Sequence, residues 1–459
     1  MKHNNMITIL MFPWLAHGHI SPFLELAKKL TLRNFFIQFC STPTNLTSIK
    51  QKIAAVDNQS ERFFSESIQL VVLNLPNLPE LHPHYHTTKI LPPHLMPTLK
   101  KAFEMAKPEF SNILKELKPD LVIYDIIQPW VPETALVHNI PAVEFVSTGA
   151  AMTSFMLHKI KNPGADFPFQ EIYLQDYEEA QIAHLMEFAL DPRKDRDRPG
   201  ECLERSVDIV LIKTCKEIEG KYFDYLSELL GKKIVPVGPI VEDIVVSEEE
   251  VDYKNSIIME WLNKKKRSST VFVSFGSELF LTKEEMEEIA MGLELSDVDF
   301  IWVVRFPAGD QEMRVEDALP EGFLERVGEK GKGMVVKGWA PQAKILVHEN
   351  VGGFVSHCGW SSSIEAMKFG VPIMAVPMIN DQPINARVLE NIGIGVGVVK
   401  DEGGRIQREK LATAIKQVIL EETGKDLRRK ASLLSEKIRS KGEEEIDVVT
   451  EELVKICKK

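Results

Sequence analysis

The span from Trp339 to Gln382 concentrates residues whose types and spacing suit a nucleotide ligand. Gly352 to Ser356 is typical of a short buried strand, His357-Cys358-Gly359-Trp360 of a tight turn, and Ser361 to Lys368 of the start of a helix. A helix that starts after a glycine-bearing turn presents unpaired backbone N–H groups and the positive end of its dipole, which attract anions. This arrangement predicts a phosphate site.

The side chains around this turn suit the other parts of a nucleotide sugar. An aromatic ring can stack on a base, amides and carboxylates can bond a base or ribose, and hydroxyls and imidazoles can donate to phosphate. The candidates are Trp339 for the base, Gln342 and Glu365 for the base and ribose, His357 and Ser362 for phosphate, and Asp381 and Gln382 for sugar hydroxyls.

Each of these residues also has a structural interpretation. Ser362 and Glu365 have the spacing of a capping box that would start a helix. Trp339 and Trp360, taken alone, are more typical of a core than of a stacking surface. The convergence of so many ligand-binding types in one span favours the ligand site.

Candidates for acid–base chemistry lie in the N-terminal half. His17 and His19 occupy the loop expected after the β-rich run Ile7–Phe12, and Asp125 follows the apolar run Leu121–Tyr124. A histidine pKa of about 6.5 suits a general base, and a carboxylate at a neighbouring strand end can orient the imidazole. The residues themselves leave either histidine open as the base, and Asp125 open as a helix cap.

Trp339 to Gln382 resembles the signature of the plant family 1 UDP-glycosyltransferases, which starts with Trp, ends with Gln and carries His-Cys-Gly-Trp in its middle. The resemblance extends over nearly the whole chain. It implies an α/β fold of the GT-B type, with two facing Rossmann-like β/α/β domains and an interdomain cleft. It also implies donor contacts from Ser277, Trp339, Ala340, Gln342, His357, Trp360, Ser361, Ser362, Glu365, Asp381 and Gln382.

Within that resemblance, Trp339 would stack on uracil, Gln342 and Glu365 would hold the ribose, and His357 with Ser362 would contact the diphosphate. Trp360, Asp381 and Gln382 would face the donor sugar. Ser361 stands where the family usually has Asn, and its shorter side chain bears on donor affinity or geometry.

The family's catalytic histidine lies in Gly-His-Ile-x-Pro, which selects His19, and its aspartate partner matches Asp125. The expected reaction is a single inverting displacement. His19 would deprotonate the acceptor hydroxyl, and the helix start at Ser362, together with His357 and Ser277, would receive the charge on the leaving diphosphate.

The resemblance also bears on the two substrates. Gln382 at the end of the signature is associated with UDP-glucose, the expected donor. The run from Phe12 to Phe23 resembles a branch that extends the sugar of an existing triterpenoid, flavonoid or similar glycoside. Acceptor contacts are expected from N-terminal loops, including Trp14 and Ser147. An aglycone acceptor, a catalytically silent nucleotide-sugar binder and a nicotinamide oxidoreductase are the alternatives.

The whole composition agrees with a soluble two-domain enzyme. The 459 residues exceed what one core usually holds, and the formal net charge of −12 argues against nucleic acid or an anionic membrane as the main partner. Five scattered cysteines without a C-x-x-C pair suit reduced thiols. No apolar run is long enough for a membrane span. We expect a cytoplasmic monomer.

Strand and helix patterns alternate along both halves, which predicts parallel sheets. The expected domains are residues 1–241 for the acceptor and 258–441 for the donor. Residues 242–257 would form a linker, and a C-terminal helix in 442–459, from about Gly442 to Lys458, would return to the first domain.

Three further patterns favour a structural interpretation. Asp195-Arg196-Asp197 has the D-x-D form of metal-dependent transferases but lies in a run of alternating charges, so we expect no required metal. His82, His84 and His86 alternate in a proline-bearing loop without an evident second shell of ligands. Gly393 to Gly397 is not G-x-G-x-x-G and predicts a turn and a strand.

Overall fold

The computed structural model describes residues 6–54, 58–186, 189–190, 193–194, 197–242, 253–277, 279–307 and 313–459. They pack into two compact units. Unit 1 comprises Met1–Phe167, Ala183–Ser247 and Lys441–Lys459, and unit 2 comprises Pro168–Ile182 and Glu248–Ser440. Asp195, Arg196 and most of the expected linker lie outside the described residues.

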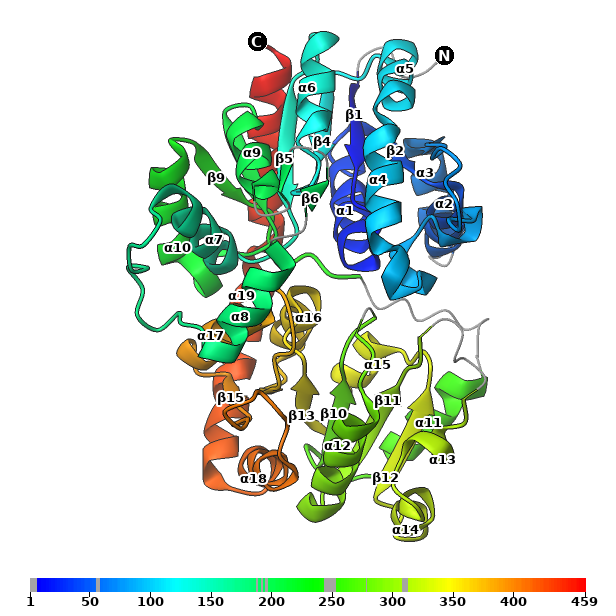
Figure 1. Cartoon of the computed structure of the whole chain (residues 1–459), viewed down its shortest axis with the longest axis vertical. Coiled ribbons are helices and arrows are strands. Elements are labelled where there is room, and N and C mark those ends of the chain that lie inside the picture. The colour runs from blue at the N-terminus through cyan, green and yellow to red at the C-terminus, as the bar shows by residue number, and fades with distance from the viewer. Residues whose placement is uncertain are drawn as a thin grey trace. The chain divides into compact units, whose positions relative to one another are not determined.

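Unit 1 is built on a seven-stranded parallel sheet with the order β3-β2-β1-β4-β5-β8-β9 (Figure 1). Its strands are β1 (Ile7–Phe12), β2 (Phe35–Ser41), β3 (Ile68–Val72), β4 (Leu121–Tyr124), β5 (Ala142–Val146), β8 (Ile209–Ile212) and β9 (Lys233–Pro236). A separate short hairpin joins β6 (Ala189–Leu190) and β7 (Arg193–Lys194).

Both faces of this sheet are covered, as the sequence of β1 illustrates. Ile9 and Met11 belong to one core with α1 (His17–Thr31) and α2 (Pro43–Ala54). Leu10 and Phe12 belong to a second core with α4 (Met96–Met105), α5 (Lys107–Leu117) and α6 (Trp130–Val137). Alternate residues of a strand point to opposite faces, so a central parallel strand must be apolar throughout.

The other helices of unit 1 connect these strands. They are α3 (Asn58–Ser67), α7 (Ala150–Lys161), α9 (Arg198–Arg205) and α10 (Lys216–Leu230), with short 3₁₀ turns at Pro83–Tyr85, Thr88–Ile90 and Pro93–Leu95. The helix α8 (Asp176–Met186) begins in unit 2 and ends in unit 1.

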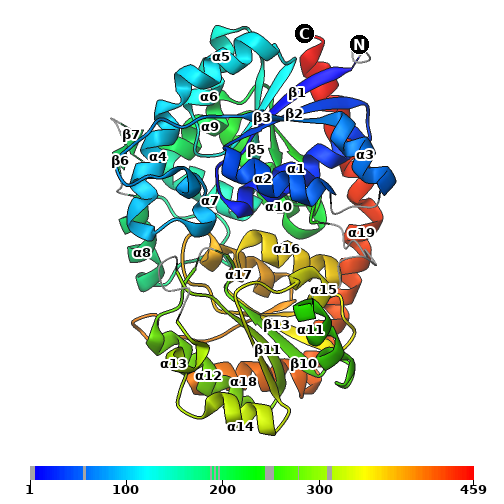
Figure 2. The same cartoon turned by 90° about the vertical axis from the view of Figure 1, so that its right-hand side faces the viewer.

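Unit 2 has a six-stranded parallel sheet with the order β12-β11-β10-β13-β14-β15. Its strands are β10 (Thr270–Ser274), β11 (Asp299–Val304), β12 (Gly333–Lys337), β13 (Val351–Ser356), β14 (Ile373–Ala375) and β15 (Gly395–Gly397). Its helices are α11 (Tyr253–Asn263), α12 (Lys283–Ser296), α13 (Val315–Ala318), α14 (Phe323–Glu329), α15 (Gln342–Leu346), α16 (Trp360–Phe369), α17 (Gln382–Asn391) and α18 (Arg408–Ile419). One face packs against α12 and α18, which lie side by side (Figure 2).

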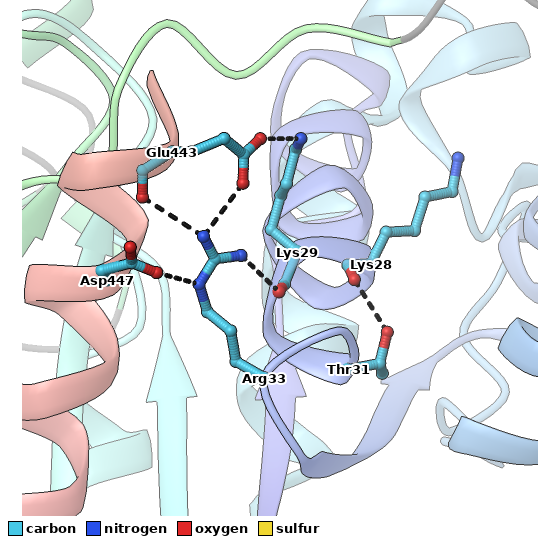
Figure 3. Close-up of polar contacts among 6 residues, drawn as sticks. All are labelled: Lys28, Lys29, Thr31, Arg33, Glu443 and Asp447. Atoms are coloured by element: carbon cyan, nitrogen blue, oxygen red, sulfur yellow. Dashed lines mark hydrogen bonds and ion pairs between the residues drawn. The ribbon is translucent and has the colours of Figure 1, made fainter. Parts of the chain in front are cut away.

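The last helix, α19 (Glu422–Cys457), begins twenty residues before the expected Gly442. Its final part belongs to unit 1, where Ile446, Val449 and Leu453 are fully buried in the core that also holds α1. Arg33, just after α1, donates to Asp447 and Glu443 at 2.6 and 2.9 Å (Figure 3). The end of the chain is thus an integral part of the first unit.

The strands expected at Ile7–Phe12, Leu121–Tyr124 and Gly352–Ser356 are present, the last one residue longer at its start, because the runs that predict them are local features. The edge strand β9 was not predicted from the sequence. The expected boundary at residue 241 also needs one correction, since Pro168–Ile182 packs in unit 2. None of the described helices is both long enough and apolar enough to cross a membrane.

Candidate functional site

His19 and Asp125 meet at the carboxyl edge of the sheet in unit 1. β1 and β4 are neighbours, with Phe12 opposite Tyr124, so the residues that follow them emerge together. His19 Nδ1 lies 2.8 Å from Asp125 Oδ2, and the aspartate is fully buried. The sequence placed His19 in a loop, but it lies in the first turn of α1, which starts at His17.

The carboxylate of Asp125 is fixed by the backbone around it. Its Oδ2 also accepts from Trp14 N at 2.9 Å, and its Oδ1 accepts from Ile126 N at 2.8 Å. Such a carboxylate orients the imidazole and stabilises its charged form. When Nδ1–H donates to Asp125, the lone pair of the ring is on Nε2, the atom that can take a proton.

The two expected acceptor residues have different environments. Ser147, directly after β5, places its Oγ 3.1 Å from His19 Nδ1. The indole of Trp14 packs edge-on against Phe103 inside the core, with 6% of the residue exposed. Within unit 1, Trp14 therefore contributes its backbone N–H, which donates to Asp125. The hydroxyl of Ser147 lies next to the imidazole of His19.

His17 differs from His19 in its electrostatic setting. Burial, reinforced by the charge of Lys52, lowers the pKa of His17 to about 4. Its imidazole is therefore neutral at physiological pH. The contact with Asp125 belongs to His19, which distinguishes the two histidines that the sequence left open.

In unit 2, two glycines enclose the ring of His357. A Cβ atom at Gly276 would lie 2.6 Å from His357 Nε2, and one at Gly359 would lie 2.5 Å from it. Burial lowers the pKa of His357 to about 4, so the ring is neutral. Its Nδ1 is buried without a hydrogen-bond partner among the described residues.

The predicted base and ribose residues already contact one another. Gln342 Nε2 donates to Glu365 Oε2 at 2.8 Å and to Ser362 Oγ at 3.2 Å. The capping-box interpretation is wrong, because α16 starts at Trp360 and its N-cap, Gly359, carries no side-chain cap. Ser362 is already inside the first turn, so its hydroxyl and the carboxylate of Glu365 bond a residue of α15 instead.

The two tryptophans of the span from Trp339 to Gln382 differ in how much of their surface is exposed. Trp339 is 56% exposed, as a stacking surface requires, whereas Trp360 is 3% exposed at the first position of α16. Ala340 is buried in the turn before α15, and Ser361 and Ser277 are partly exposed, Ser277 directly after Gly276. The predicted donor residues thus gather at the carboxyl ends of β10, β12, β13 and β14.

Asn385 is a residue of this site that sequence reasoning missed. It is 1% exposed, and its Nδ2 donates to Asp381 Oδ2 at 2.8 Å and to Cys358 O at 2.9 Å. Gln382 Oε1 accepts from Met378 N and Ile379 N, both at 2.9 Å. The spacing of four residues between Asp381 and Asn385 on a helix is the signal that could have identified Asn385.

The histidine-rich loop does not gather its rings at one point. His82 and His84 are exposed with their rings stacked 5.7 Å apart, whereas His86 is buried.

Within the described residues, the group whose atoms lie close enough to share a metal ion is Cys215, Glu217 and Glu445, and Glu217 is ion-paired with Lys441 at 2.6 Å.

Two family models together match nearly the whole chain. The model described as "Glycosyltransferase, N-terminal domain" matches residues 5–242, and "UDP-glucoronosyl and UDP-glucosyl transferase" matches residues 245–437. A mogroside IIIx synthase of Siraitia grosvenorii is 54% identical over 450 residues, covering 97% of each chain. The chain belongs to the UDP-glycosyltransferase family.

Other relatives of this glycosyltransferase are similar over equally long stretches. A β-D-glucosyl crocetin β-1,6-glucosyltransferase of Gardenia jasminoides is 51% identical and covers 97% of this chain and 98% of its own. A flavanone 7-O-glucoside 2″-O-β-L-rhamnosyltransferase of Citrus maxima is 48% identical and covers 100% and 99%.

The fold of this glycosyltransferase has solved counterparts. A UGT of Glycyrrhiza uralensis, complexed with glycyrrhetinic acid 3-O-monoglucuronide, superposes with a TM-score of 0.80 at 23% identity, covering 98% of this chain and 96% of its own. The fold is therefore GT-B, as expected. The protein is an enzyme that transfers a sugar from a UDP-sugar to a small-molecule acceptor.

Proposed function

We propose that this glycosyltransferase moves glucose from UDP-glucose to a sugar hydroxyl of an existing small-molecule glycoside, with inversion at the anomeric carbon. The observation that carries the catalytic part is the 2.8 Å contact between His19 Nδ1 and Asp125 Oδ2. The acceptor class is supported by the names of the Gardenia and Citrus relatives, which describe transfer to glucosides.

In the proposed mechanism, His19 Nε2 takes the proton of the acceptor hydroxyl while its oxygen bonds to the anomeric carbon. The bond from that carbon to the UDP oxygen breaks on the opposite face, so an α-linked donor gives a β-linked product. Asp125 stabilises the imidazolium that forms. Charge on the departing diphosphate is met by the start of α16, by His357 and by Ser277.

The donor contacts are proposed from unit 2. Trp339 stacks on uracil, Gln342 and Glu365 hold the ribose, and Asp381 and Gln382 bind the glucose hydroxyls. The remaining assigned residues are Ala340, in the turn before α15, and Trp360, Ser361 and Ser362, in the first turn of α16. Because burial keeps His357 neutral, its contribution to the diphosphate is a hydrogen bond and not a charge.

The test is turnover by the wild type and by His19→Ala, using UDP-glucose with a panel of flavonoid and triterpenoid glucosides and the matching aglycones. We expect glucoside products with a new β-linkage by NMR, and loss of turnover in His19→Ala with UDP binding retained in calorimetry. His17→Ala is the matched control and keeps turnover. Equal turnover in His19→Ala, or retained configuration, would refute the mechanism, and activity on aglycones alone would refute the acceptor class.

The proposed enzyme needs no metal ion and works as a cytoplasmic monomer. The described thiols fit a reducing compartment, because none of the five cysteines is paired with another. We expect full activity in EDTA and the elution volume of a monomer in size-exclusion chromatography. Activity lost in EDTA and restored by a divalent ion would contradict the first expectation.

A further inference from the structure

A buried carboxylate connects two helices of unit 1 next to the histidine. Glu219 is 1% exposed and lies where α10 is interrupted, with φ −131° and ψ 22°. Its Oε2 accepts from Ala150 N and its Oε1 from Ala151 N, both at 2.8 Å. The first N–H groups of a helix lack partners within it, so a side chain of α10 satisfies the start of α7.

The start of α7 is shaped to receive this carboxylate. Its N-cap, Gly149, supplies no side-chain cap, and a Cβ atom there would lie 2.8 Å from Glu219 Oε1. Thr153 Oγ1 donates to Gly149 O at 2.8 Å, which fixes the same turn from within the helix. A side chain at position 149 would therefore push the carboxylate away from the helix.

The segment held in this way contains Ser147, only two residues before Gly149. Ser147 Oγ lies 3.1 Å from His19 Nδ1, the same nitrogen that contacts Asp125 Oδ2 at 2.8 Å. Ser147 and Asp125 follow the neighbouring strands β5 and β4 directly, so the imidazole is supported from two strand ends. Asp125 accepts hydrogen bonds from Trp14 N and Ile126 N. In the same way, Glu219 accepts hydrogen bonds from Ala150 N and Ala151 N, directly after the loop that contains Ser147.

The charge of Glu219 matches the helix end it contacts. Burial raises the pKa of Glu219 to about 7, while the hydrogen bonds from Ala151 and Ala150 act in the opposite direction. A carboxylate is stabilised at the positive end of a helix dipole, so ionisation strengthens the attachment of α7.

We propose that Glu219 is a positioning residue for the catalytic base: it anchors the start of α7, which holds Ser147 against Nδ1 of His19. This inference rests on the proposed role of His19. The contact network continues from α10 to the ring that accepts the proton. Displacement of a reacting group by about 1 Å can cost roughly 100-fold in rate, so a support of this kind affects turnover.

The experiment compares Glu219→Ala, Glu219→Gln, Ser147→Ala and the Glu219→Ala/Ser147→Ala double variant, assayed below the Tm of every variant. We expect kcat to fall about 10- to 100-fold in Glu219→Ala, less in Glu219→Gln, with the Kd for UDP unchanged because its proposed site is in unit 2. The double variant should lose no more than the worse single variant, since both remove one support.

Thr282→Ala is the matched control. Thr282 Oγ1 accepts from Glu285 N at 3.2 Å as the cap of α12, so its loss destabilises a helix start without touching His19. We expect its kcat to equal that of the wild type. Unchanged kcat in folded Glu219→Ala or in Ser147→Ala, or losses that multiply in the double variant, would overturn the inference.

A second readout does not depend on the acceptor. In protein carrying ¹⁵N-labelled histidine, the ring signal that disappears in His19→Ala identifies His19, and we expect it to shift in Glu219→Ala and to stay in Thr282→Ala. An unmoved signal would overturn the inference. Failure of the wild type on every glycoside would instead overturn the proposed function, and the two outcomes are therefore distinguishable.

Discussion

The side chains proposed for the donor sugar are already bonded to unit 2 itself, and Asn385 is central to them. It connects Asp381 to the carbonyl of Cys358, a non-glycine residue with φ +64° in the turn after β13. Asp381 is therefore oriented before a ligand arrives. Pre-orientation lowers the entropy that binding costs, and it restricts which hydroxyl arrangement fits.

Asn385→Ala should raise the KM for UDP-glucose about 5- to 150-fold, because a buried carbonyl loses its donor and Asp381 loses its orientation, an effect of about 1–3 kcal/mol. Competition between UDP-glucose and UDP-galactose should show weaker discrimination. Asn350→Ala is the control, since Asn350 Nδ2 makes a comparable buried bond to Leu262 O at 3.0 Å. Equal donor KM values in both variants would contradict the role of Asn385.

His357 makes the stability of unit 2 sensitive to acid. Its pKa is lowered from 6.5 to about 4 in the folded protein, so the unfolded chain binds the proton first as the pH falls. Stability is therefore lost below about pH 6.5, by roughly 2 kcal/mol between pH 7 and pH 5. We expect that the free energy of unfolding of His357→Gln, measured in urea, does not show this loss between pH 7 and pH 5.

The comparison is made as the difference between the wild type and the variant at each pH. Glu219, with its raised pKa, contributes in the opposite direction, losing stability as the pH rises from 4.5 to about 7. It titrates in both proteins and so cancels. A difference between wild type and His357→Gln that stays constant from pH 7 to pH 5 would refute the assignment.

At the scale of the elements, the segment Pro168–Ile182 belongs to unit 2, although the residues before and after it in the sequence belong to unit 1. It packs in unit 2, where Glu178 Oε2 lies 3.4 Å from Arg387 Nη2 and the Arg387 guanidinium lies 4.4 Å from the ring centre of Tyr173. Tyr177 packs flat against Gly404, where a Cβ atom would lie 2.6 Å from its ring. Arg387 belongs to α17, the helix that begins at Gln382.

Arg387→Met should destabilise unit 2 by about 3–5 kcal/mol, because Glu178, 2% exposed, would remain as an unpaired buried charge. The double variant Arg387→Met/Glu178→Met should recover part of that loss, since no charge then stays buried. Urea unfolding of the four proteins of this cycle measures the coupling. Additive losses would show that the pair does not hold the segment.

At the scale of the whole molecule, the chain end completes the first unit, and two kinds of contact attach it. Arg33 is ion-paired with Glu443 and Asp447, whose side chains are 63% and 66% exposed (Figure 3). Leu453 is fully buried in the core beside α1. Exposed ion pairs contribute about 0–1 kcal/mol each, whereas a buried leucine truncated to alanine costs about 2–5 kcal/mol.

Leu453→Ala should therefore lower the free energy of unfolding several times more than Arg33→Ala. The smaller effect of Arg33→Ala should shrink further in about 1 M salt, which screens exposed charges. Urea unfolding at low and high salt checks both statements. A larger loss in Arg33→Ala would mean that the ion pairs, and not the apolar face, hold the end of α19.

The sequence by itself determined the features that depend on neighbouring residues. Apolar β-rich runs of the kind in β1 and β10 predict central strands because a parallel strand is buried on both faces. The proposed donor residues were predicted because most of them lie in one continuous span, and Asp125 because it directly follows an apolar strand. The sequence alone misplaced the starts of α1 and α19, which both begin before the residues where their local signals place them.

Only the tertiary structure decided which other distant residues meet. The contact of His19 with Asp125 across 106 positions was predicted, whereas those of His19 with Ser147 across 128 positions and of Glu219 with Ala150 across 69 were not. Nothing in the local pattern of Glu219 or Glu178 distinguishes it from a solvated carboxylate on a helix. The partners of these two carboxylates depend on which strand ends are neighbours and on where the chain passes from one unit to the other. The path of the chain is in turn set by the burial of all its apolar faces together.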